Sequence, residues 1–389
     1  MEQHPITKAI RIQTERTREG EHSTPLFLTS SFCFDNAEDM RAAFADETDE
    51  NIYSRFSNPT VNEFVDKMIA LEGAEAGVAT STGMSAVFAS FMALLKSGDH
   101  IVSCDAVFGS THNIIKKYLP KYGIECTYVS ADKMEEWEAA IKPNTKMIYL
   151  ETPTNPALEI IDLAFVSTLA KKYNLIVNID NCFATPVNQR PIDFGAHIVL
   201  HSATKWIDGQ GRVLGGVIVG EKNLVNDIYL FCRNTGPSLS PFNAWVLTKS
   251  LETLDVRMER HAKNALHIAN ALDNHPKISW LKYPFLKSHP QYEIAVKQMK
   301  NGGGVLCFEL KGGLESGRKF LNSLEMLTLT ANLGDSRSIA SHPASTTHGK
   351  LTEEERLKVN ITPGLIRISV GLEYADDILN DILQALEKC

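Results

Sequence analysis

Residues 198–220 read IVLHSATKWIDGQGRVLGGVIVG, and the interpretation of the whole chain depends on this stretch. The pattern predicts a short apolar strand, a turn that contains Lys205, a glycine-rich loop and a second apolar strand. A lysine at the end of a strand costs side-chain entropy and, if it is buried, desolvation free energy. Lys205 is therefore expected either to reach solvent or to have a chemical role.

Apolar runs of the same kind recur before this stretch, and amphipathic helical segments separate them. Such alternation predicts a mostly parallel sheet with helices on both faces. Sheets of this kind bind ligands at the carboxyl ends of their strands, so polar residues there are candidates for a site. The runs are HIVSC (100–104), ECTYVS (125–130), KMIYLET (146–152) and LIVNIDN (175–181).

The 389 residues are expected to form an arm and two domains. Residues 1–60 are polar and turn-rich and form the arm, and a helix from Val61 to Leu71 that ends at Gly73 opens an α/β domain at 61–250. A long helical stretch from about Asn243 to His275 leads into a smaller α+β domain at 251–389.

Composition excludes several classes of protein. Apolar residues make up 43% and charged residues 22%, as in soluble globular chains. A net charge of −8 without a basic stripe argues against nucleic-acid binding. The run VFASFMALL is too short to span a membrane, and the N-terminus has no signal-peptide pattern. Seven scattered cysteines favour neither disulfides nor a metal site, so a cytoplasmic protein is expected.

Polar residues at three strand ends suggest one chemistry. STGMSA (81–86) predicts a turn that opens a helix, which is either a phosphate site or an ordinary helix cap. Asp180 either caps a helix or holds a proton on a heterocyclic nitrogen. Ser202 and Thr204 could complete a phosphate site, and the Lys205 amine could form a Schiff base with an aldehyde. Together these features indicate pyridoxal 5'-phosphate as the cofactor.

Seven motifs resemble those of one family in order and spacing. They are similar to motifs of the pyridoxal-phosphate enzymes of Cys/Met metabolism, which include cystathionine gamma-synthase, gamma- and beta-lyases and homoserine-ester sulfhydrylases. The resemblance covers essentially the whole chain and implies an aspartate-aminotransferase-like fold (fold type I) and a homotetramer of dimers with shared active sites. The motifs are YSRFSNPT, STGMSA, ETPTNP, DNCFATP, HSATKWIDG, HPASTTH and LIRISVGLE.

The resemblance also implies roles for individual residues. Lys205 would carry the cofactor, Asp180 would pair with its pyridine nitrogen, and Phe108 would stack on its ring. Asn155, Ser338 and Arg367 would bind the substrate near its carboxylate. The cofactor phosphate would be bound by Ser81, Gly83, Met84, Ser202 and Thr204, and by Tyr53 and Arg55 of the neighbouring subunit.

Two departures from the family pattern bear on the reaction. Phe108 stands where the synthases and lyases have a tyrosine, and Asn113 where an arginine is usual. Phenylalanine can stack but cannot transfer a proton. Within the family, VFGST, HSATKWIDGQGRVLGG and NLGDSRSIASHPASTTHGKL most resemble the enzymes that join sulfide to O-succinylhomoserine.

The expected reaction is therefore a gamma-replacement that converts O-succinyl-L-homoserine and sulfide to L-homocysteine and succinate. Arg337 is a candidate for binding the succinyl carboxylate, although it could equally be a surface arginine. The alternatives are cystathionine gamma-synthase with cysteine as nucleophile, O-acetylhomoserine sulfhydrylase, and a methionine or cystathionine gamma-lyase. A cofactor-binding regulatory protein without turnover is a further alternative, against which Lys205, Asp180 and Arg367 argue.

Overall fold

The computed structural model describes residues 3–346, 349, 352–358 and 361–389. Thr347 and His348, the last two residues of the HPASTTH motif, lie outside the described residues. Within the described ranges, no helix is both long enough and apolar enough to cross a membrane.

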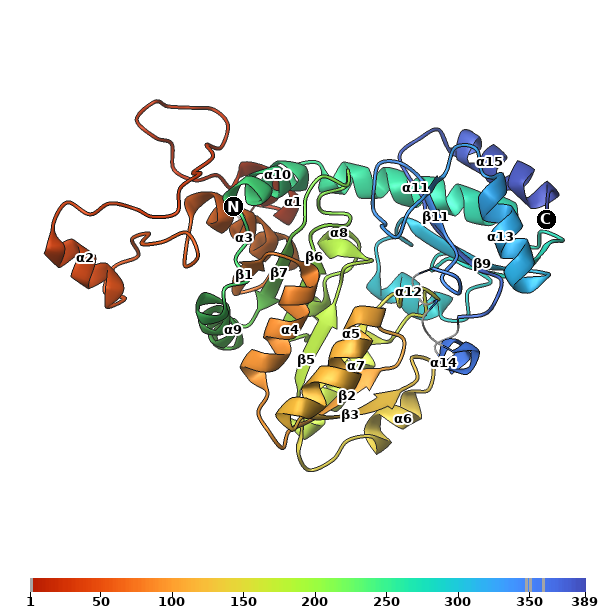
Figure 1. Cartoon of the computed structure of the whole chain (residues 1–389), viewed down its shortest axis with the longest axis horizontal. Coiled ribbons are helices and arrows are strands. Elements are labelled where there is room, and N and C mark those ends of the chain that lie inside the picture. Colours follow the sequence, from red (N-terminus) through yellow and green to blue (C-terminus); the bar gives the residue numbers. More distant parts are fainter. Residues whose placement is uncertain (1–2, 347–348, 350–351, 359–360) are drawn as a thin grey trace.

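The N-terminal arm leaves the body of the molecule and returns to it (Figure 1). Its base is anchored by the buried carboxylate of Glu63, which accepts hydrogen bonds from the hydroxyls of Thr14 at 3.0 Å and Thr24 at 2.7 Å. Farther out, an isolated bridge pairs Ser31 with Tyr53. The helices of the arm are α1 (Pro5–Arg11) and α2 (Ala37–Phe44).

Helix α3 (Pro59–Glu72) follows the arm and has the ends that its sequence predicts. The Asn58 side chain caps it by accepting a hydrogen bond from the Thr60 N–H at 3.0 Å. Gly73 ends it with a φ of 73°, a left-handed conformation in which its N–H donates to the Ile69 carbonyl. The predicted helix and its end at Gly73 are confirmed.

Within the described residues, seven strands form the large sheet in the order β1-β7-β6-β5-β4-β2-β3. Neighbours from β6 to β3 are parallel, whereas β7 is antiparallel to both β1 and β6. The prediction of a mostly parallel sheet is confirmed. The strands are β1 (Ala76–Thr80), β2 (His100–Cys104), β3 (Glu125–Val129), β4 (Thr145–Glu151), β5 (Ile176–Asp180), β6 (Ile198–Ser202) and β7 (Gly216–Gly220).

Helices cover this sheet (Figure 1). Strands β2 and β7 are buried along their whole length, as expected for strands covered on both faces. The further helices of this part are α4 (Gly83–Leu94), α5 (Gly109–Asn113), the π-helical turn η1 (Ile114–Tyr118), the 3₁₀ turns η2 (Leu119–Tyr122) and η3 (Pro191–Phe194), α6 (Met134–Ala139), α7 (Leu163–Tyr173), α8 (Thr185–Asn188) and α9 (Lys222–Thr235).

The connection to the C-terminal part differs from the sequence prediction. Instead of one helical stretch there are two helices, α10 (Pro241–Leu251) and α11 (Leu254–Leu272). At the break, the Ser250 carbonyl accepts hydrogen bonds from the Thr253 N–H at 3.2 Å and from the Arg257 side chain at 2.9 Å. The Arg257 side chain therefore helps to satisfy a carbonyl at the end of α10.

Five strands in the described C-terminal part form a second sheet in the order β10-β11-β12-β9-β8. Only the short β10–β11 pair is parallel. Its apolar core includes Phe308, Phe320 and Ile366. We propose the domain division given by the sequence, 1–60, 61–250 and 251–389. The elements are β8 (Ile278–Lys282), α12 (Tyr292–Gln298), β9 (Val305–Leu310), α13 (Gly313–Ser323), β10 (Thr328–Leu329), β11 (Ile339–Ser341), α14 (Glu353–Lys358), β12 (Leu365–Ser369) and α15 (Ala375–Glu387).

Candidate active site

A cavity of about 240 Å³ lies at the carboxyl ends of the parallel strands, where the C-terminal part of the chain adds residues from β12 and from the segment between β10 and β11. Most of the residues predicted for the site line this cavity, although they come from distant parts of the chain. These residues are Gly83, Met84, Phe108, Asn155, Asp180, Ser202, Thr204, Lys205 and Arg367.

One end of the cavity is formed by the N-terminus of α4. The Thr82 hydroxyl caps this helix by accepting a hydrogen bond from the Ser85 N–H at 3.0 Å. Gly83 lies so close to β6 that a Cβ there would approach the Ser202 Cβ within 2.6 Å, which is why a glycine is required. Free N–H groups at a helix start and the hydroxyls of Ser202 and Thr204 form a suitable environment for a phosphate.

Lys205 reaches into the cavity from the turn after β6. Its Nζ donates a hydrogen bond to Oδ1 of Asn332 at 2.7 Å. Desolvation by burial lowers the pKa of the Lys205 amine, and the positive charge of Arg367 lowers it further. A larger fraction of the amine is therefore uncharged and able to act as nucleophile or base.

Asn332 is a site residue that sequence reasoning missed. Besides accepting from Lys205, it uses its backbone carbonyl to accept a hydrogen bond from Arg367 at 3.2 Å. Its loop packs directly on the lysine turn, because a Cβ on Gly334 would lie 2.6 Å from the Trp206 nitrogen. Asn332 is the first residue of the stretch NLGDSRS, but it gave no chemical signal there, since asparagine is also common in turns.

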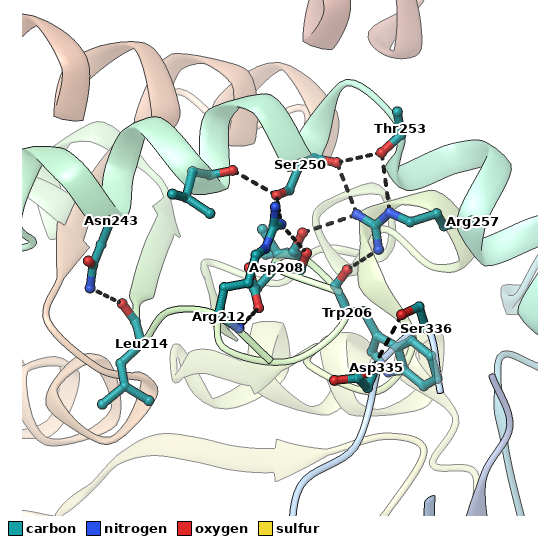
Figure 2. A network of polar contacts seen from close by, with 12 residues as sticks. Trp206, Asp208, Arg212, Leu214, Asn243, Ser250, Thr253, Arg257, Asp335 and Ser336 are labelled. Atoms are coloured by element: carbon teal, nitrogen blue, oxygen red, sulfur yellow. Dashed lines mark hydrogen bonds and ion pairs between the residues drawn. The ribbon is translucent and has the colours of Figure 1, made fainter. Parts of the chain in front are cut away.

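The loop that follows Lys205 is anchored by helices outside the sheet (Figure 2). Buried Arg257 on α11 donates a hydrogen bond to the Trp206 carbonyl at 2.6 Å. Arg212, at the far end of the loop, donates to the Ser250 hydroxyl at 2.6 Å. The backbone beyond the lysine is therefore held against the junction between α10 and α11.

Asp180 ends β5 and lines the cavity. Burial raises the pKa of its carboxyl to about 6, while the Cys182 N–H, which donates to it at 3.0 Å, and the positive charge of His201 oppose the rise. With that pKa the carboxylate is still mostly charged at neutral pH.

Glu151, at the end of the neighbouring strand β4, is a second carboxyl group that the sequence prediction left out. Burial raises its pKa well above the usual range, and the charge of Asp180 adds to the rise. Its Oε2 accepts a hydrogen bond from the Phe108 N–H at 3.0 Å. Since two adjacent carboxylates repel each other, burial and the charge of Asp180 both favour the protonated form of Glu151.

Arg367 on β12 and Asn155 after β4 meet at the wall of the cavity. Arg367 donates a hydrogen bond to Oδ1 of Asn155 at 3.0 Å, and it is buried. Desolvation lowers the pKa of its guanidinium to about 10, so it remains charged. Its Nε has no hydrogen-bond partner among the described residues. A buried charged donor without a partner is suited to binding a carboxylate.

Tyr53 and Arg55 do not line the cavity of their own chain. The Arg55 side chain donates to the Arg233 carbonyl, and its guanidinium carbon lies 5.4 Å from the centroid of the Tyr53 ring. Tyr53 is 40% exposed. Their role at the phosphate of a neighbouring subunit stays a prediction.

Ser81 and Ser338 also lie outside the cavity lining. The Ser81 N–H donates to the Pro237 carbonyl at 2.7 Å, and the cavity-lining cap is its neighbour Thr82. The Ser338 hydroxyl donates to the Glu373 carboxylate at 3.0 Å. A contribution of either serine to ligand binding therefore stays a prediction.

Arg337 is likewise absent from the cavity lining. Its side chain is 69% exposed and pairs with both carboxylate oxygens of Asp335, at 3.0 and 3.1 Å. This pairing fixes a positive charge beside the segment that carries Asn332, but it does not direct the charge into the cavity.

The residues present fit pyridoxal phosphate. The α4 terminus offers N–H groups to a phosphate, the Asp180 carboxylate can pair with a pyridinium nitrogen, and Lys205 provides a partly deprotonated amine. The free Nε of Arg367 is available to a substrate carboxylate.

The fold and the site define a pyridoxal-phosphate-dependent enzyme of the aspartate-aminotransferase-like fold, fold type I. A family model described as Cys/Met metabolism PLP-dependent enzyme matches residues 6–387, and the chain belongs to this family. The sequence-based assignments of family, fold class and cofactor are confirmed.

Two kinds of relative are similar over nearly the full length. An O-succinylhomoserine sulfhydrylase of Pseudomonas aeruginosa is 45% identical and covers 98% of this chain and 94% of its own. An L-methionine gamma-lyase of Fusobacterium nucleatum is 43% identical and covers 98% of both chains. The family is thus shown, whereas both kinds of activity occur among its similar members.

Solved structures agree with the fold. A putative O-acetylhomoserine (thiol)-lyase of Campylobacter jejuni has a TM-score of 0.94 at 33% identity and covers 99% of this chain and 100% of its own. That protein carries N'-pyridoxyl-lysine-5'-monophosphate at its position 205. The metB protein of Corynebacterium glutamicum has a TM-score of 0.93 at 38% identity, covering 99% and 98%.

Proposed function

We propose that the protein catalyses gamma-replacement on O-succinyl-L-homoserine, with sulfide as nucleophile and L-homocysteine and succinate as products. The bond between the γ carbon and the ester oxygen breaks, and a carbon–sulfur bond forms at the same carbon. No net oxidation or reduction occurs.

The observation that carries the proposal is Phe108 at the cavity. Its ring is 38% exposed and its N–H is bound by Glu151, so the side chain belongs to the wall of the site. Among the described residues that line the cavity there is no tyrosine. Sulfide is a good nucleophile and needs less activation than the thiol of cysteine. A site without a tyrosine hydroxyl to transfer protons is therefore better suited to sulfide.

Lys205 is the candidate for the proton transfers. Bound pyridoxal phosphate would supply an aldehyde that joins the substrate amine and withdraws electrons from its α carbon. The Lys205 amine would then be free to remove the α proton and afterwards a β proton, because burial lowers its pKa. Asn332, which accepts from Nζ at 2.7 Å, would orient the free amine.

Substrate orientation would depend on the side of the cavity formed by the second domain. The Arg367 guanidinium, steadied by Asn155 at 3.0 Å, would hold the α-carboxylate through its unpaired Nε. Asp180 would keep a proton on the pyridine nitrogen and so maintain the electron-withdrawing power of the ring. For the succinyl carboxylate we propose Arg337.

The second candidate is a methionine gamma-lyase, favoured by the 43% identity to the Fusobacterium nucleatum enzyme. A lyase would eliminate the γ substituent and release a 2-oxo acid without needing a second nucleophile. Cystathionine gamma-synthase remains a third candidate, in which cysteine replaces sulfide.

We also propose that the enzyme is a homotetramer of dimers, in which Tyr53 and Arg55 complete the partner's phosphate site. The support is that the arm projects from the body (Figure 1) and carries exposed apolar residues, among them Leu28, Met40 and Phe44. Such residues are expected to be covered in an assembly.

The test is a substrate matrix with cofactor-loaded enzyme. O-Succinyl-L-homoserine and O-acetyl-L-homoserine are each combined with sulfide or cysteine, L-methionine is offered alone, and products are identified by mass spectrometry. Homocysteine formed mainly from the succinyl ester supports the proposal. Cystathionine as the main product would establish the synthase, and a 2-oxo acid from methionine the lyase.

The role of Phe108 is tested in the same assay with Phe108→Tyr and, as the matched control, Phe108→Leu. We expect the tyrosine variant to raise the ratio of cystathionine to homocysteine by about tenfold, which corresponds to about 1.4 kcal/mol of transition-state stabilisation. An equal change in both variants would show that the tyrosine hydroxyl is not the cause.

A further inference from the structure

A fully buried acid–histidine pair lies behind the cavity wall that carries Asp180. His201 on β6 and Glu72 at the end of α3 place Nε2 and Oε1 2.6 Å apart, and both side chains are at most 1% exposed. Asn181, the residue after Asp180, donates from Nδ2 to the same Glu72 oxygen at 2.9 Å. The pair is thus bonded to the backbone segment that presents Asp180.

Glu72 has few other partners. Its Oε2 has no hydrogen-bond partner among the described residues. Arg190 donates its Nε to the Glu72 backbone carbonyl at 3.2 Å and pairs its guanidinium with Asp193, so neither of these contacts is to the Glu72 carboxylate. A charged Glu72 therefore requires a cation, and His201 is the group in position to be one.

His201 also borders the cavity. It is among the residues that line the cavity, as Asp180 is, and the two strands are paired so that Asp180 lies opposite Leu200, the residue before His201. Other titratable groups that line the cavity are Glu151, Cys182, Lys205 and Arg367. Burial raises the pKa of Asp180, and among charged side chains His201 is the one that lowers it.

We propose that Glu72 holds His201 as an imidazolium, and that this buried ion pair keeps Asp180 charged against the pyridine nitrogen. Glu72 and His201 are then positioning residues, since they act through Asp180. The inference rests on the role of Asp180 given in the proposed function, and it adds residues from α3 to the site.

The arrangement is a row of alternating charges. In the proposed state Glu72 would be negative, His201 positive and Asp180 negative, and a pyridinium held by Asp180 would add a positive charge, so each charge would have an opposite charge nearby in a region of low dielectric. Without the His201 charge, Asp180 would bind a proton more tightly and would be less able to hold one on the pyridine nitrogen of bound cofactor. We would then expect the Lys205 nitrogen of the loaded protein to lose its proton at a higher pH.

The test uses the visible absorbance of the cofactor-loaded protein, titrated from pH 5 to pH 10. Glu72→Gln keeps an acceptor for Asn181 but removes the charge, and His201→Asn removes the cation directly. We expect both variants to raise the midpoint of the titration by about one pH unit, an ordinary shift for the loss of one nearby charge. Cofactor content and thermal unfolding are measured on each sample.

The matched control is His100→Asn. His100 is also a buried histidine of the large sheet, with its ring nitrogens 2.8 Å from the Thr145 hydroxyl and 2.9 Å from the Thr127 hydroxyl, but it begins β2 and does not line the cavity. We expect this variant to lower thermal stability without moving the midpoint. A shift equal to that of His201→Asn would overturn the proposal.

The variant Asp180→Asn distinguishes a failure of the role assigned to Asp180 from a failure of the ion-pair proposal. If Asp180→Asn leaves the absorbance titration unchanged, the assigned role of Asp180 fails. If Asp180→Asn shifts the midpoint while Glu72→Gln and His201→Asn do not, the ion-pair proposal alone is overturned. Support requires that Glu72→Gln adds no further shift in the Asp180→Asn background, because residues that act through one group are not additive.

Discussion

The cavity around Lys205 and the arm that carries Tyr53 and Arg55 are both assigned to the cofactor by sequence, but the structure treats them differently. The Lys205 Nζ donates a hydrogen bond to Asn332 at 2.7 Å inside a cavity lined by residues from both sheets and the loops beside them. Tyr53 and Arg55 are exposed and pair with each other and with their own chain.

A sequence motif can therefore predict that a residue binds the cofactor, but it does not show whether the residue acts in its own chain or in a second copy. The groups around Lys205 converge within one chain because consecutive parallel strands end at the same edge of the sheet. The arm has no such constraint, and its residues can reach a phosphate only if a second copy lies against it.

The largest effect is expected from Lys205→Ala. Removing the amine deletes both the covalent attachment of the cofactor and the proposed base, so product formation should fall by at least about 10³-fold. Borohydride reduction followed by whole-protein mass spectrometry should show the cofactor attached to the wild type and not to the variant. Turnover of the variant at the wild-type rate would contradict the role assigned to Lys205 in the cavity.

A stability effect is expected from Asp180 in the cofactor-free protein. Its pKa is raised from 3.8 to about 6. Between about pH 4 and pH 6, the carboxyl group is therefore protonated in the folded state but charged in the unfolded state. Stability from this group is therefore present at low pH and is lost as pH rises from about 4 to 6, by on the order of 3 kcal/mol.

Urea unfolding of wild type and Asp180→Asn at pH 4.5 and pH 7.5 checks this expectation. The free energy of unfolding of the variant, relative to wild type, should increase with pH over this interval. An unchanged difference would mean that Asp180 is already charged in the cofactor-free protein.

The arm is tested by Arg55→Ala. If Arg55 binds the partner's phosphate, losing one charged hydrogen bond should weaken cofactor affinity by about 10- to 100-fold. Arg41→Ala is the matched control, since Arg41 is an exposed arm arginine paired with Glu38 and Glu47.

Mixed oligomers sharpen the same test. Subunits with Arg55→Ala mixed with subunits with Lys205→Ala should regain activity above either parent, because one site then combines an intact lysine with an intact arm. Activity that stays at the average of the two parents would mean that Arg55 does not act on a partner's site.

The smallest effect is expected from Arg337→Ala at the rim. Because its charge is exposed and paired with Asp335, KM for the succinyl ester should rise by no more than about fivefold, with KM for the acetyl ester unchanged. Arg318→Ala, another exposed arginine in an ion pair, is the control. Equal changes for both esters would remove Arg337 from substrate recognition.

Sequence reasoning predicted much of the site because the polar residues at strand ends stand out against apolar runs. Asp180, Ser202 and Lys205 were predicted in this way, and Arg367 by family resemblance; all four line the cavity. Glu151 also ends an apolar strand, but it was not among the predicted site residues, because a single carboxyl group does not indicate one particular chemical role.

Other contributors had no sequence signal at all. Asn332 is an ordinary loop asparagine until Gly334 packs its loop against the turn after Lys205. The contact between Glu72 and His201 joins residues 129 positions apart. Such pairs depend on long-range packing, which local patterns do not contain.

The sequence by itself determined the fold class, the cofactor and the lysine, because strand periodicity and the order of chemical groups along the chain are local properties. The tertiary structure alone brings particular charged groups together. It lowers the pKa of Lys205, raises the pKa of Asp180 and Glu151, and keeps Tyr53 and Arg55 outside the Lys205 cavity of their own chain. The physical reason is that desolvation and charge interactions depend on distances in space rather than on positions in the sequence.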